Sequence, residues 1–223
     1  EISHLSSQFN EMAIRLEESF SDLAAERDTL RRFIADASHE LRTPLSRIRL
    51  GVEMLKKKRT PEREIALEKD IAELDGLIEE ILLMSRLDSN KKPKLGDQID
   101  LLALAAEECA RYEDCTVKGS SVLIDGDARL LRRMLRNLLD NASKHGMPPI
   151  EVEISSGSEA ATLSVVDTGP GVAPKDRDHV FEPFYRSPGK QNVEGFGLGL
   201  ALVRQIAEAH GGTAAISEGQ ASA

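Results

Sequence analysis

The chain has 223 residues, of which 40% are hydrophobic, so it can bury the core of one large domain or two modest ones. Its net charge is −9 and its longest basic run is residues 56–59, which disfavours nucleic-acid binding. It has no apolar run of membrane-spanning length and no signal-peptide pattern, so we expect nothing in it to span a membrane.

Residues 1–32 have the spacing of a coiled-coil helix. The stripe recurs at steps of three and four residues, at Ile2, Leu5, Phe9, Met12, Leu16, Phe20, Leu23, Arg27 and Leu30, and all of these except Arg27 are apolar. Two consecutive steps of four residues meet at Leu16, which shifts the phase of the repeat and locally unwinds a coiled coil. The sustained stripe predicts that this helix pairs with a second copy of the chain.

Residues 33–48 continue the helix and place a histidine off its apolar face. The apolar stripe here consists of Phe33, Ile34, Ala37, Leu41, Leu45 and Ile48. His39 lies roughly 200° around the helix from that stripe, so we expect its imidazole to face solvent or another domain. Glu40 is adjacent, Thr43 lies one turn on along the same face, and Pro44 removes the hydrogen bond that the Glu40 carbonyl would accept. A lone histidine on a helix surface usually has no chemical function. Other motifs in the chain are therefore needed to assign a function to His39.

A second helix should follow a short turn. The first helix is predicted to end near Arg59, because Thr60 can cap a new helix and Pro61 suits its first position. The helical stripe then continues to about Leu87. Two such hairpins, one from each of two chains, would form a four-helix bundle with both His39 side chains on its outside.

The C-terminal part mixes helices and strands. Residues 89–96 are rich in Pro, Gly and charge, which is typical of a linker. We predict helices over 101–111 and from a cap at Asp127 through Leu139, and strands over 122–124, 150–154 and 162–166. The absence of a regular βαβ rhythm favours an α+β sandwich. Cys109 and Cys115 are too few for a disulfide framework or a zinc site, and we expect both to be reduced.

Polar residues in this part suggest a ligand site. Asn137 and Asn141 share one helical face, where their amide oxygens suit Mg²⁺, and Lys144 lies one turn further on, where it could meet phosphate. Asp167 ends a strand and could accept a hydrogen bond from an exocyclic amine such as that of adenine. Each feature alone has an ordinary explanation, either surface polarity or a turn.

Glycines flank the same region. They precede or follow turns at Gly169, Gly171, Gly195, Gly197 and Gly199. The last three stand before a helix that runs to His210, and free N–H groups at a helix N-terminus suit phosphate. A dinucleotide-binding fold is excluded because no βαβ unit brackets these glycines.

These segments together resemble bacterial sensor histidine kinases. The sequence His-Glu-Leu-Arg-Thr-Pro at residues 39–44 resembles the H-box, and the later segments resemble the N, G1, F and G2 boxes of the ATP-binding domain, whose GHKL fold also occurs in gyrase. The opening residues resemble the end of a HAMP module. The resemblance implies a HAMP end and signalling helix at 1–32, a dimerisation and phosphotransfer domain at 33–90, a linker at 91–97 and a catalytic domain at 98–223.

The resemblance also implies roles for individual residues. His39 would be the phosphoacceptor, Glu40 its proton acceptor and Thr43 the residue that orients water for dephosphorylation. Asn141 and Asn137 would hold Mg²⁺, and residues 187–194 would form a mobile lid. The remaining nucleotide-binding residues would be Asp167 at the adenine, together with Lys144, His145, Gly169, Gly171, Gly195, Gly197, Leu198 and Gly199.

The sequence departs from the family at two places. His145 stands where the family commonly has Tyr or Phe, which implies weaker stacking on adenine. The final residues replace the family's last strand, and we expect a weaker sheet edge there.

The residue at position 137 distinguishes hydrolytic members of this fold from members that transfer phosphate to a protein. Hydrolytic relatives have at this position a Glu that activates water, whereas an amide has no usable basicity. Bound ATP should therefore persist until His39 accepts its γ-phosphoryl group, since phosphoryl transfer needs mainly positioning and charge neutralisation. The resemblance then implies a homodimer, transfer to an Asp of a response regulator, and a cytoplasmic location with membrane contact only through segments outside this chain, in the bacterial inner membrane.

Two other classes stay open. A GHKL-type ATPase or protein-serine kinase would turn over ATP without His39. A nucleotide-binding signalling scaffold would bind ATP without transferring phosphate. The residues at positions 39, 40, 137 and 141 favour the kinase.

Overall fold

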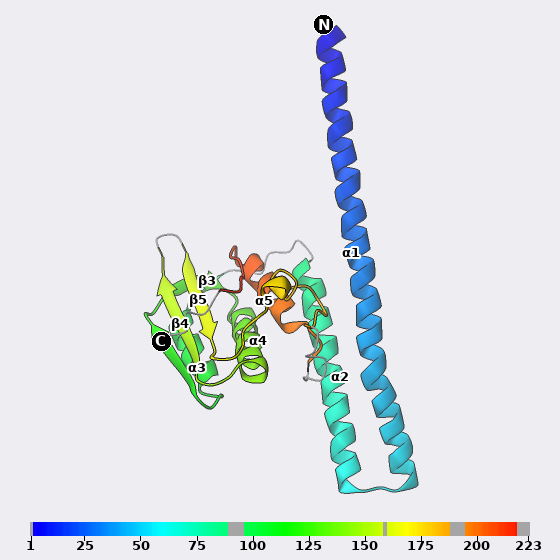
Figure 1. Ribbon diagram of the computed structural model, residues 1–223, viewed down its shortest axis with the longest axis vertical. Helices are drawn as coiled ribbons and strands as arrows, with labels where there is room; N and C mark the ends of the chain where they lie inside the picture. Colours follow the sequence, from blue (N-terminus) through cyan, green and yellow to red (C-terminus); the bar gives the residue numbers. More distant parts are fainter. Residues whose placement is uncertain (1, 89–95, 158–159, 188–194, 218–223) are drawn as a thin grey trace. The chain divides into compact units, whose positions relative to one another are not determined.

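The computed structural model describes residues 2–88, 96–157, 160–187 and 195–217, and for residues 2–14, 18, 22, 25, 26 and 88 the backbone alone. The chain divides into two compact units, Glu1–Leu74 and Asp75–Ala223. Figure 1 shows their elements along the chain.

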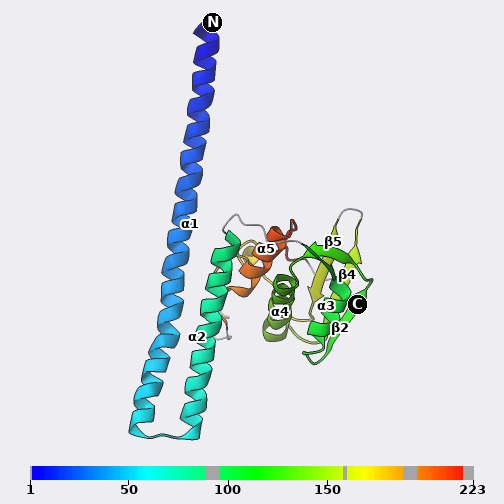
Figure 2. The same cartoon turned by 180° about the vertical axis from the view of Figure 1, so that it is seen from behind.

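The first unit is a helical hairpin. Helix α1 (Ile2–Lys57) is continuous and includes Pro44, and helix α2 (Pro61–Asp88) carries the chain into the second unit. The first part of α2 runs antiparallel to α1 after the short turn at residues 58–60 (Figures 1 and 2). The helix bounds confirm the ends predicted from the sequence, including Pro61 as the first residue of the second helix.

Side chains from both helices close this hairpin. The Arg63 guanidinium of α2 donates to the carbonyl oxygens of Met54 at 3.0 Å and Lys58 at 2.8 Å. The Lys58 carbonyl lies just beyond the end of α1, so Arg63 satisfies a backbone acceptor there, whereas the Met54 carbonyl also accepts the Lys58 N–H group at 3.0 Å. Further along, Arg47 of α1 pairs with Asp70 of α2 at 3.2 Å. These contacts fix the turn and the register of the two helices.

The second unit is an α+β sandwich, as the sequence predicts. Its main sheet has the order β2-β4-β5, with β2 parallel to β4 and β4 antiparallel to β5, and a separate antiparallel pair joins β1 to β3. The strands are β1 (Asp97–Asp100), β2 (Cys115–Gly119), β3 (Leu123–Gly126), β4 (Ile150–Ser156) and β5 (Ala161–Val166). The helices are α3 (Leu101–Cys109), α4 (Ala128–His145) and α5 (Gly199–Ala209), with a 3₁₀ turn at Pro174–Asp176.

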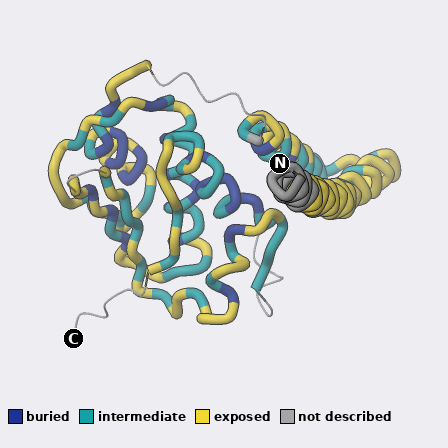
Figure 3. The backbone as a smooth tube through the Cα atoms, turned by 90° about the horizontal axis from the view of Figure 1, so that it is seen from above, coloured by how far each residue is buried: buried dark blue, intermediate teal, exposed yellow. Residues whose placement is uncertain are grey.

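The core of this unit lies between the sheet and its helices. Strand β4 alternates, with Ile150, Val152 and Ile154 buried and the intervening glutamates less buried or exposed, because successive side chains of a strand point to opposite faces. The helix residues that complete the core are Leu101, Leu104, Ala105, Leu131, Leu135 and Leu139. Figure 3 shows the buried positions gathered inside this unit.

Polar residues set where the helices begin. The Asp127 carboxylate accepts the backbone N–H groups of Arg129 at 2.8 Å and Leu130 at 3.3 Å, which confirms the predicted cap of α4. Asp100 caps α3 in the same way, through the N–H group of Leu102 at 2.9 Å.

Some expectations were incomplete or wrong. Strands β1 and β2 were not predicted, because Asp-Gln-Ile-Asp and Cys-Thr-Val-Lys-Gly are short and mostly polar. The expectation of reduced thiols was wrong, since Cys109 and Cys115 form a disulfide in this structure. The sequence could not show that the turn after α3 returns the chain until their Cα atoms are 5.5 Å apart. Residues 213–217 form no strand.

Candidate functional site

His39 occupies the position on α1 that the helical period predicts. Its side chain is exposed, as is that of Thr43, whereas Glu40 is half-buried. Ala37 and Pro44 mark the buried face of the helix. The imidazole is therefore presented away from that face, next to a carboxylate and within one turn of a hydroxyl.

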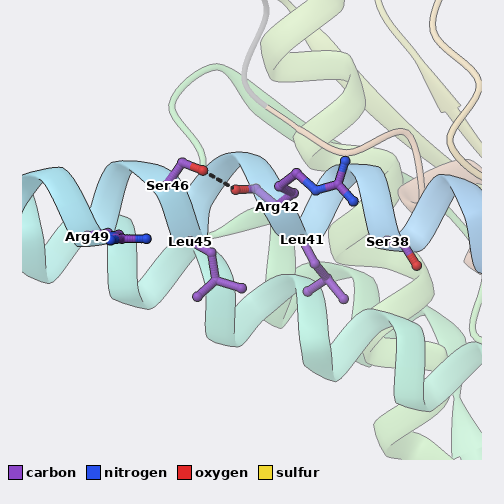
Figure 4. A pocket seen from close by; sticks show the side chains of 6 residues that line it. All are labelled: Ser38, Leu41, Arg42, Leu45, Ser46 and Arg49. Carbon is purple, nitrogen blue, oxygen red and sulfur yellow. Dashed lines mark hydrogen bonds between the residues drawn. The ribbon is translucent and has the colours of Figure 1, made fainter.

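A shallow hollow lies along α1 just after His39 (Figure 4). It is lined by six residues of this one helix, Ser38, Leu41, Arg42, Leu45, Ser46 and Arg49. Leu41 and Leu45 project side by side in Figure 4, and Ser46 donates to the Arg42 carbonyl at 2.9 Å. Leu45 is 54% exposed, so this part of α1 presents apolar surface beside polar side chains.

In the second unit, Asn137 joins two of the predicted ligand-binding segments. Its side chain is buried on α4, and its Nδ2 donates to the Gly199 carbonyl at the start of α5, at 3.2 Å. Asn141 is half-buried and Lys144 exposed, one and two turns further along α4. Because Nδ2 of Asn137 is used by Gly199, its Oδ1 is the atom that could ligate a metal.

Asp167 is held at the end of β5 beside the end of α4. Its Oδ1 accepts the N–H group of Gly169 at 2.8 Å. A Cβ atom on Gly146 would lie 2.3 Å from the Asp167 Cγ, and one on Gly169 would lie 2.6 Å from the Gly146 Cα. The Thr168 N–H group donates to the Met147 carbonyl at 3.0 Å. The two glycines thus allow a close approach that brings the carboxylate to the end of α4, the helix that carries Asn137 and Asn141.

The glycine segment before α5 packs against the aromatic segment that precedes it. Gly197 has φ +74° and its carbonyl accepts the Phe184 N–H group at 3.0 Å. A Cβ atom there would lie 2.7 Å from the Tyr185 carbonyl oxygen. Leu198 is fully buried, so its side chain packs in the interior and is not exposed to a ligand in this structure.

Sequence reasoning missed the residues that hold this aromatic segment. The Arg204 guanidinium of α5 lies 4.5 Å from the centre of the Phe181 ring, a cation–π contact. The Tyr185 hydroxyl donates to the buried Asp176 carboxylate at 2.9 Å. The motif Phe-Glu-Pro-Phe-Tyr was visible in the sequence, but no spacing rule connects it to a helix that follows it.

A carboxylate also lies near the basic side chains of α4. Within the second unit, Glu80 of α2 pairs with Arg133 at 2.8 Å. Burial raises the pKa of Glu80, and the charges of Arg133 and Lys144 oppose that rise. Lys144, where phosphate was predicted to bind, thus acts on Glu80 through its charge.

The donor set suits a nucleotide better than an independent metal. Among the residues that the structure describes, no three His, Cys, Asp or Glu side chains converge as a metal site. Mg²⁺ commonly retains waters and binds through substrate phosphates with few protein ligands. The amide oxygens of Asn137 and Asn141 fit that mode. The predicted lid, apart from Ser187, lies outside the described residues.

Comparisons with known proteins place both units in one family. Residues 29–90 match the His Kinase A (phospho-acceptor) domain, and residues 126–222 match the Histidine kinase-, DNA gyrase B-, and HSP90-like ATPase domain. The chain is 36% identical over 218 residues to Sensor protein RstB of Escherichia coli K12, covering 93% of this chain and 50% of that protein.

A second relative is similar to this chain in sequence, and a solved structure is similar to it in fold. The chain is 36% identical over 238 residues to the histidine-protein kinase/phosphatase MprB of Mycolicibacterium smegmatis, covering 98% of this chain and 46% of that protein. Its fold matches the Acinetobacter baumannii histidine kinase AdeS with a TM-score of 0.64 at 24% identity, covering 77% and 86% of the two chains.

The chain spans about half the length of these curated relatives. The two matched domains follow one another in the order of the H-box and the nucleotide-binding boxes. The chain therefore belongs to the two-component sensor histidine kinases and is a kinase core of that family.

Proposed function

We propose that this chain transfers the γ-phosphoryl group of ATP to His39 and then passes it to an aspartate of a response regulator. The observation that carries the proposal is the exposed His39 beside Glu40, within the residues that match the phospho-acceptor domain. The matched ATPase-like domain, with Asp167 and Asn137 fixed by glycine contacts, supplies the nucleotide site.

Nucleotide binding uses groups that the fold already positions. The Asp167 carboxylate would accept a hydrogen bond from the adenine amine, while the backbone around Gly195–Gly199 and Lys144 would face the phosphates. The amide oxygens of Asn141 and Asn137 would hold a Mg²⁺ ion that arrives with ATP. When bound, that ion would neutralise charge on the phosphates.

Transfer requires the second unit to bring ATP to α1. One ring nitrogen of neutral His39 attacks the γ-phosphorus, the bond to the β–γ bridging oxygen breaks, and ADP leaves. The other ring nitrogen then loses its proton to Glu40, which leaves a phosphohistidine whose ring is neutral and whose phosphoryl group is anionic. Water competes poorly because Asn137, whose amide is bound to Gly199, cannot act as a general base.

We also propose that the chain can remove phosphate from the regulator. Thr43 is exposed one turn after His39, where its hydroxyl could orient a water molecule. The relative MprB is named a kinase/phosphatase, which supports a dual activity in this chain.

A second copy of this chain is the proposed partner of the helical unit. Large apolar side chains along α1 are exposed at Leu16, Phe20, Leu23, Leu30, Ile34, Leu45 and Val52. Most of their spacings are three, four or seven residues, the pattern of a helix that packs against other helices. The hollow in Figure 4 lies on this stripe, so the dimer would cover Leu41 and Leu45.

The chain would act as the cytoplasmic part of a longer protein anchored in the inner membrane. The relatives are about twice as long, and no helix among the described residues is long and apolar enough to cross a membrane. Residues 1–32 would then carry the upstream signal as the end of a HAMP module, with the phase shift at Leu16 permitting two packings of similar energy.

The test is incubation with γ-labelled Mg·ATP, followed by exposure of the labelled protein to acid and to alkali. Label that is stable in alkali and labile in acid identifies phosphohistidine. We expect His39→Ala to lose all such label and to keep its affinity for ATP. His4→Ala, which removes the other histidine of α1, is the matched control and should label normally.

The remaining outcomes separate the alternatives. Acid-stable label would indicate a serine or threonine kinase, and steady phosphate release without His39 would indicate an ATPase. Tight ATP binding without any label would indicate a nucleotide-binding scaffold. Retention of acid-labile label in His39→Ala would contradict the assignment of His39.

A further inference from the structure

The Cys109–Cys115 disulfide closes a small ring in the second unit. Cys109 is the last residue of α3 and Cys115 the first of β2, and their Cα separation of 5.5 Å is within the usual range for a disulfide. The intervening turn includes Asp114, which has a positive φ of 55°. The bond therefore joins a helix end to the start of a strand of the main sheet.

Both redox states of this pair fit the structure. Cys109 is 3% exposed and Cys115 is half-buried, so Cys115 is the more accessible residue of the pair to a thiol in solvent. The Sγ of Cys109 lies 3.8 Å from the Thr116 carbonyl oxygen. A thiol formed by reduction thus has an acceptor within the range of a sulfur hydrogen bond.

The ring is connected to the ligand-binding helix. Within it, the Tyr112 hydroxyl donates to the Asp140 carboxylate of α4 at 2.6 Å. Burial, followed by the hydrogen bond to Asp140, raises the pKa of Tyr112, so the hydroxyl keeps the proton that it donates. Asp140 immediately precedes Asn141. The closed ring holds Tyr112 against the helix that carries the proposed Mg·ATP ligands.

Intracellular disulfides in most organisms are transient or redox-sensing rather than structural. We propose that Cys109 and Cys115 form a reversible dithiol–disulfide site whose oxidised form strengthens nucleotide binding through Tyr112. This inference rests on the proposed function, because it requires the second unit to bind ATP inside the cell. The chemical class of its reaction partner is a protein or small-molecule dithiol.

The exchange balances without any other reactant. A thiolate of the dithiol attacks the Cys115 Sγ, and the Cys109–Cys115 bond breaks to leave a Cys109 thiolate, which takes up a proton. The second thiolate of the dithiol then attacks the mixed disulfide and releases the Cys115 thiolate, which is also protonated. The dithiol is oxidised to its disulfide by the two electrons that reduce the pair.

The first readout is the redox state itself. The whole chain is equilibrated in buffers of graded ratio of reduced to oxidised dithiothreitol, quenched in acid and alkylated with a maleimide polymer that shifts its mobility. We expect two alkylated cysteines in the reduced form, none in the oxidised form, and full reversal between them. The reduced form should unfold at a temperature lower by roughly 5 °C, because closing the ring limits the unfolded chain. Thiols that stay reactive in every oxidising buffer would overturn the proposal.

The second readout is nucleotide affinity, measured with a fluorescent ATP analogue and Mg²⁺. We expect the oxidised form to bind about fivefold more tightly, at the lower end of typical coupling between two sites. Cys115→Ser should show the weaker affinity in both buffers. Tyr112→Phe should keep the alkylation pattern and lose the difference in affinity.

The outcomes distinguish this proposal from the function on which it rests. Equal affinity of the oxidised and reduced forms would overturn only the redox inference, as would a redox-dependent affinity that persists in Tyr112→Phe. Failure of both forms to bind the nucleotide would overturn the proposed function together with the coupling.

Discussion

The two regions of the molecule treat apolar side chains in opposite ways. On α1, Leu16, Phe20 and Leu23 are between 57% and 64% exposed, whereas Leu139 and Val152 in the second unit are completely buried. Figure 3 shows the same contrast, with α1 mostly exposed and buried positions concentrated within the sandwich. One chain therefore completes the core of the second unit but leaves the stripe of α1 open.

This difference relates each region to its role. A stripe of exposed apolar residues with coiled-coil spacing is typical of a surface that packs against another helix, which fits the dimer proposed for the helical unit. The second unit has its own core and the glycine contacts around Asp167, so it offers a preformed framework for the proposed nucleotide site. Substitutions that act on stability in one region and on assembly in the other test this distinction.

The largest effect on stability should come from Leu139→Ala. Leu139 is completely buried between α4 and the sheet, and truncating such a leucine removes burial and leaves a cavity. We expect the free energy of unfolding of the second unit to fall by about 2–5 kcal/mol. Urea unfolding followed by circular dichroism would measure it.

Leu45→Ala on α1 is the matched control. Leu45 is 54% exposed, so its truncation should change the unfolding of the second unit by less than about 0.5 kcal/mol. It should instead weaken association of two chains in analytical ultracentrifugation. Equal losses of stability from Leu139→Ala and Leu45→Ala would contradict the contrast between the buried core of the second unit and the exposed stripe of α1.

A smaller effect is expected at the buried carboxylate of Glu108. Its oxygens accept from Arg136 at 2.6 Å and from Arg132, which joins α3 to α4. Glu108→Gln should lower the free energy of unfolding by about 2 kcal/mol, because the guanidinium groups of Arg111, Arg132 and Arg136 lose a charged partner but remain partly solvated. Glu107→Gln, which removes an exposed partner of Arg132, should change it by less than about 0.5 kcal/mol.

The same carboxylate predicts a dependence on pH. Hydrogen bonds from Arg136 and then Arg132 outweigh burial and lower the pKa of Glu108 in the folded protein. Its contribution to stability is complete above the unfolded pKa of about 4.3 and is lost as the pH falls through the lower folded value. Chemical unfolding at pH 6 and at graded acidic pH should therefore show a smaller acid-induced loss in Glu108→Gln than in the wild type, and parallel losses would be the contradicting result.

Sequence patterns predicted much of the fold because long helices can be recognised from the regular spacing of their apolar residues. The bounds of α1 and α2, the cap at Asp127 and the exposed face of His39 all follow from spacing and end signals. Contacts between segments far apart in the chain could not be predicted from residue spacing. No local pattern reveals that Asn137 would donate to Gly199, or that Arg204 would cover Phe181. The short polar strands and the disulfide were missed for the same reason, since tertiary structure determines both.

The last predicted effect is a gain in stability, and it tests whether the part of α2 that belongs to the second unit is covered by a second copy of the chain. A Cβ atom on Gly76, within α2, would meet nothing within 4 Å in this chain, so Gly76→Ala should stabilise by about 0.5–1 kcal/mol through helix propensity alone. Gly51→Ala on α1 should gain less, because its Cβ atom would lie 3.2 Å from the Leu67 side chain and force it to move. Thermal unfolding followed by far-UV circular dichroism would compare the two variants. Destabilisation by Gly76→Ala that disappears on dilution would show that a partner chain packs against this residue, and destabilisation at every concentration would contradict the open environment seen here.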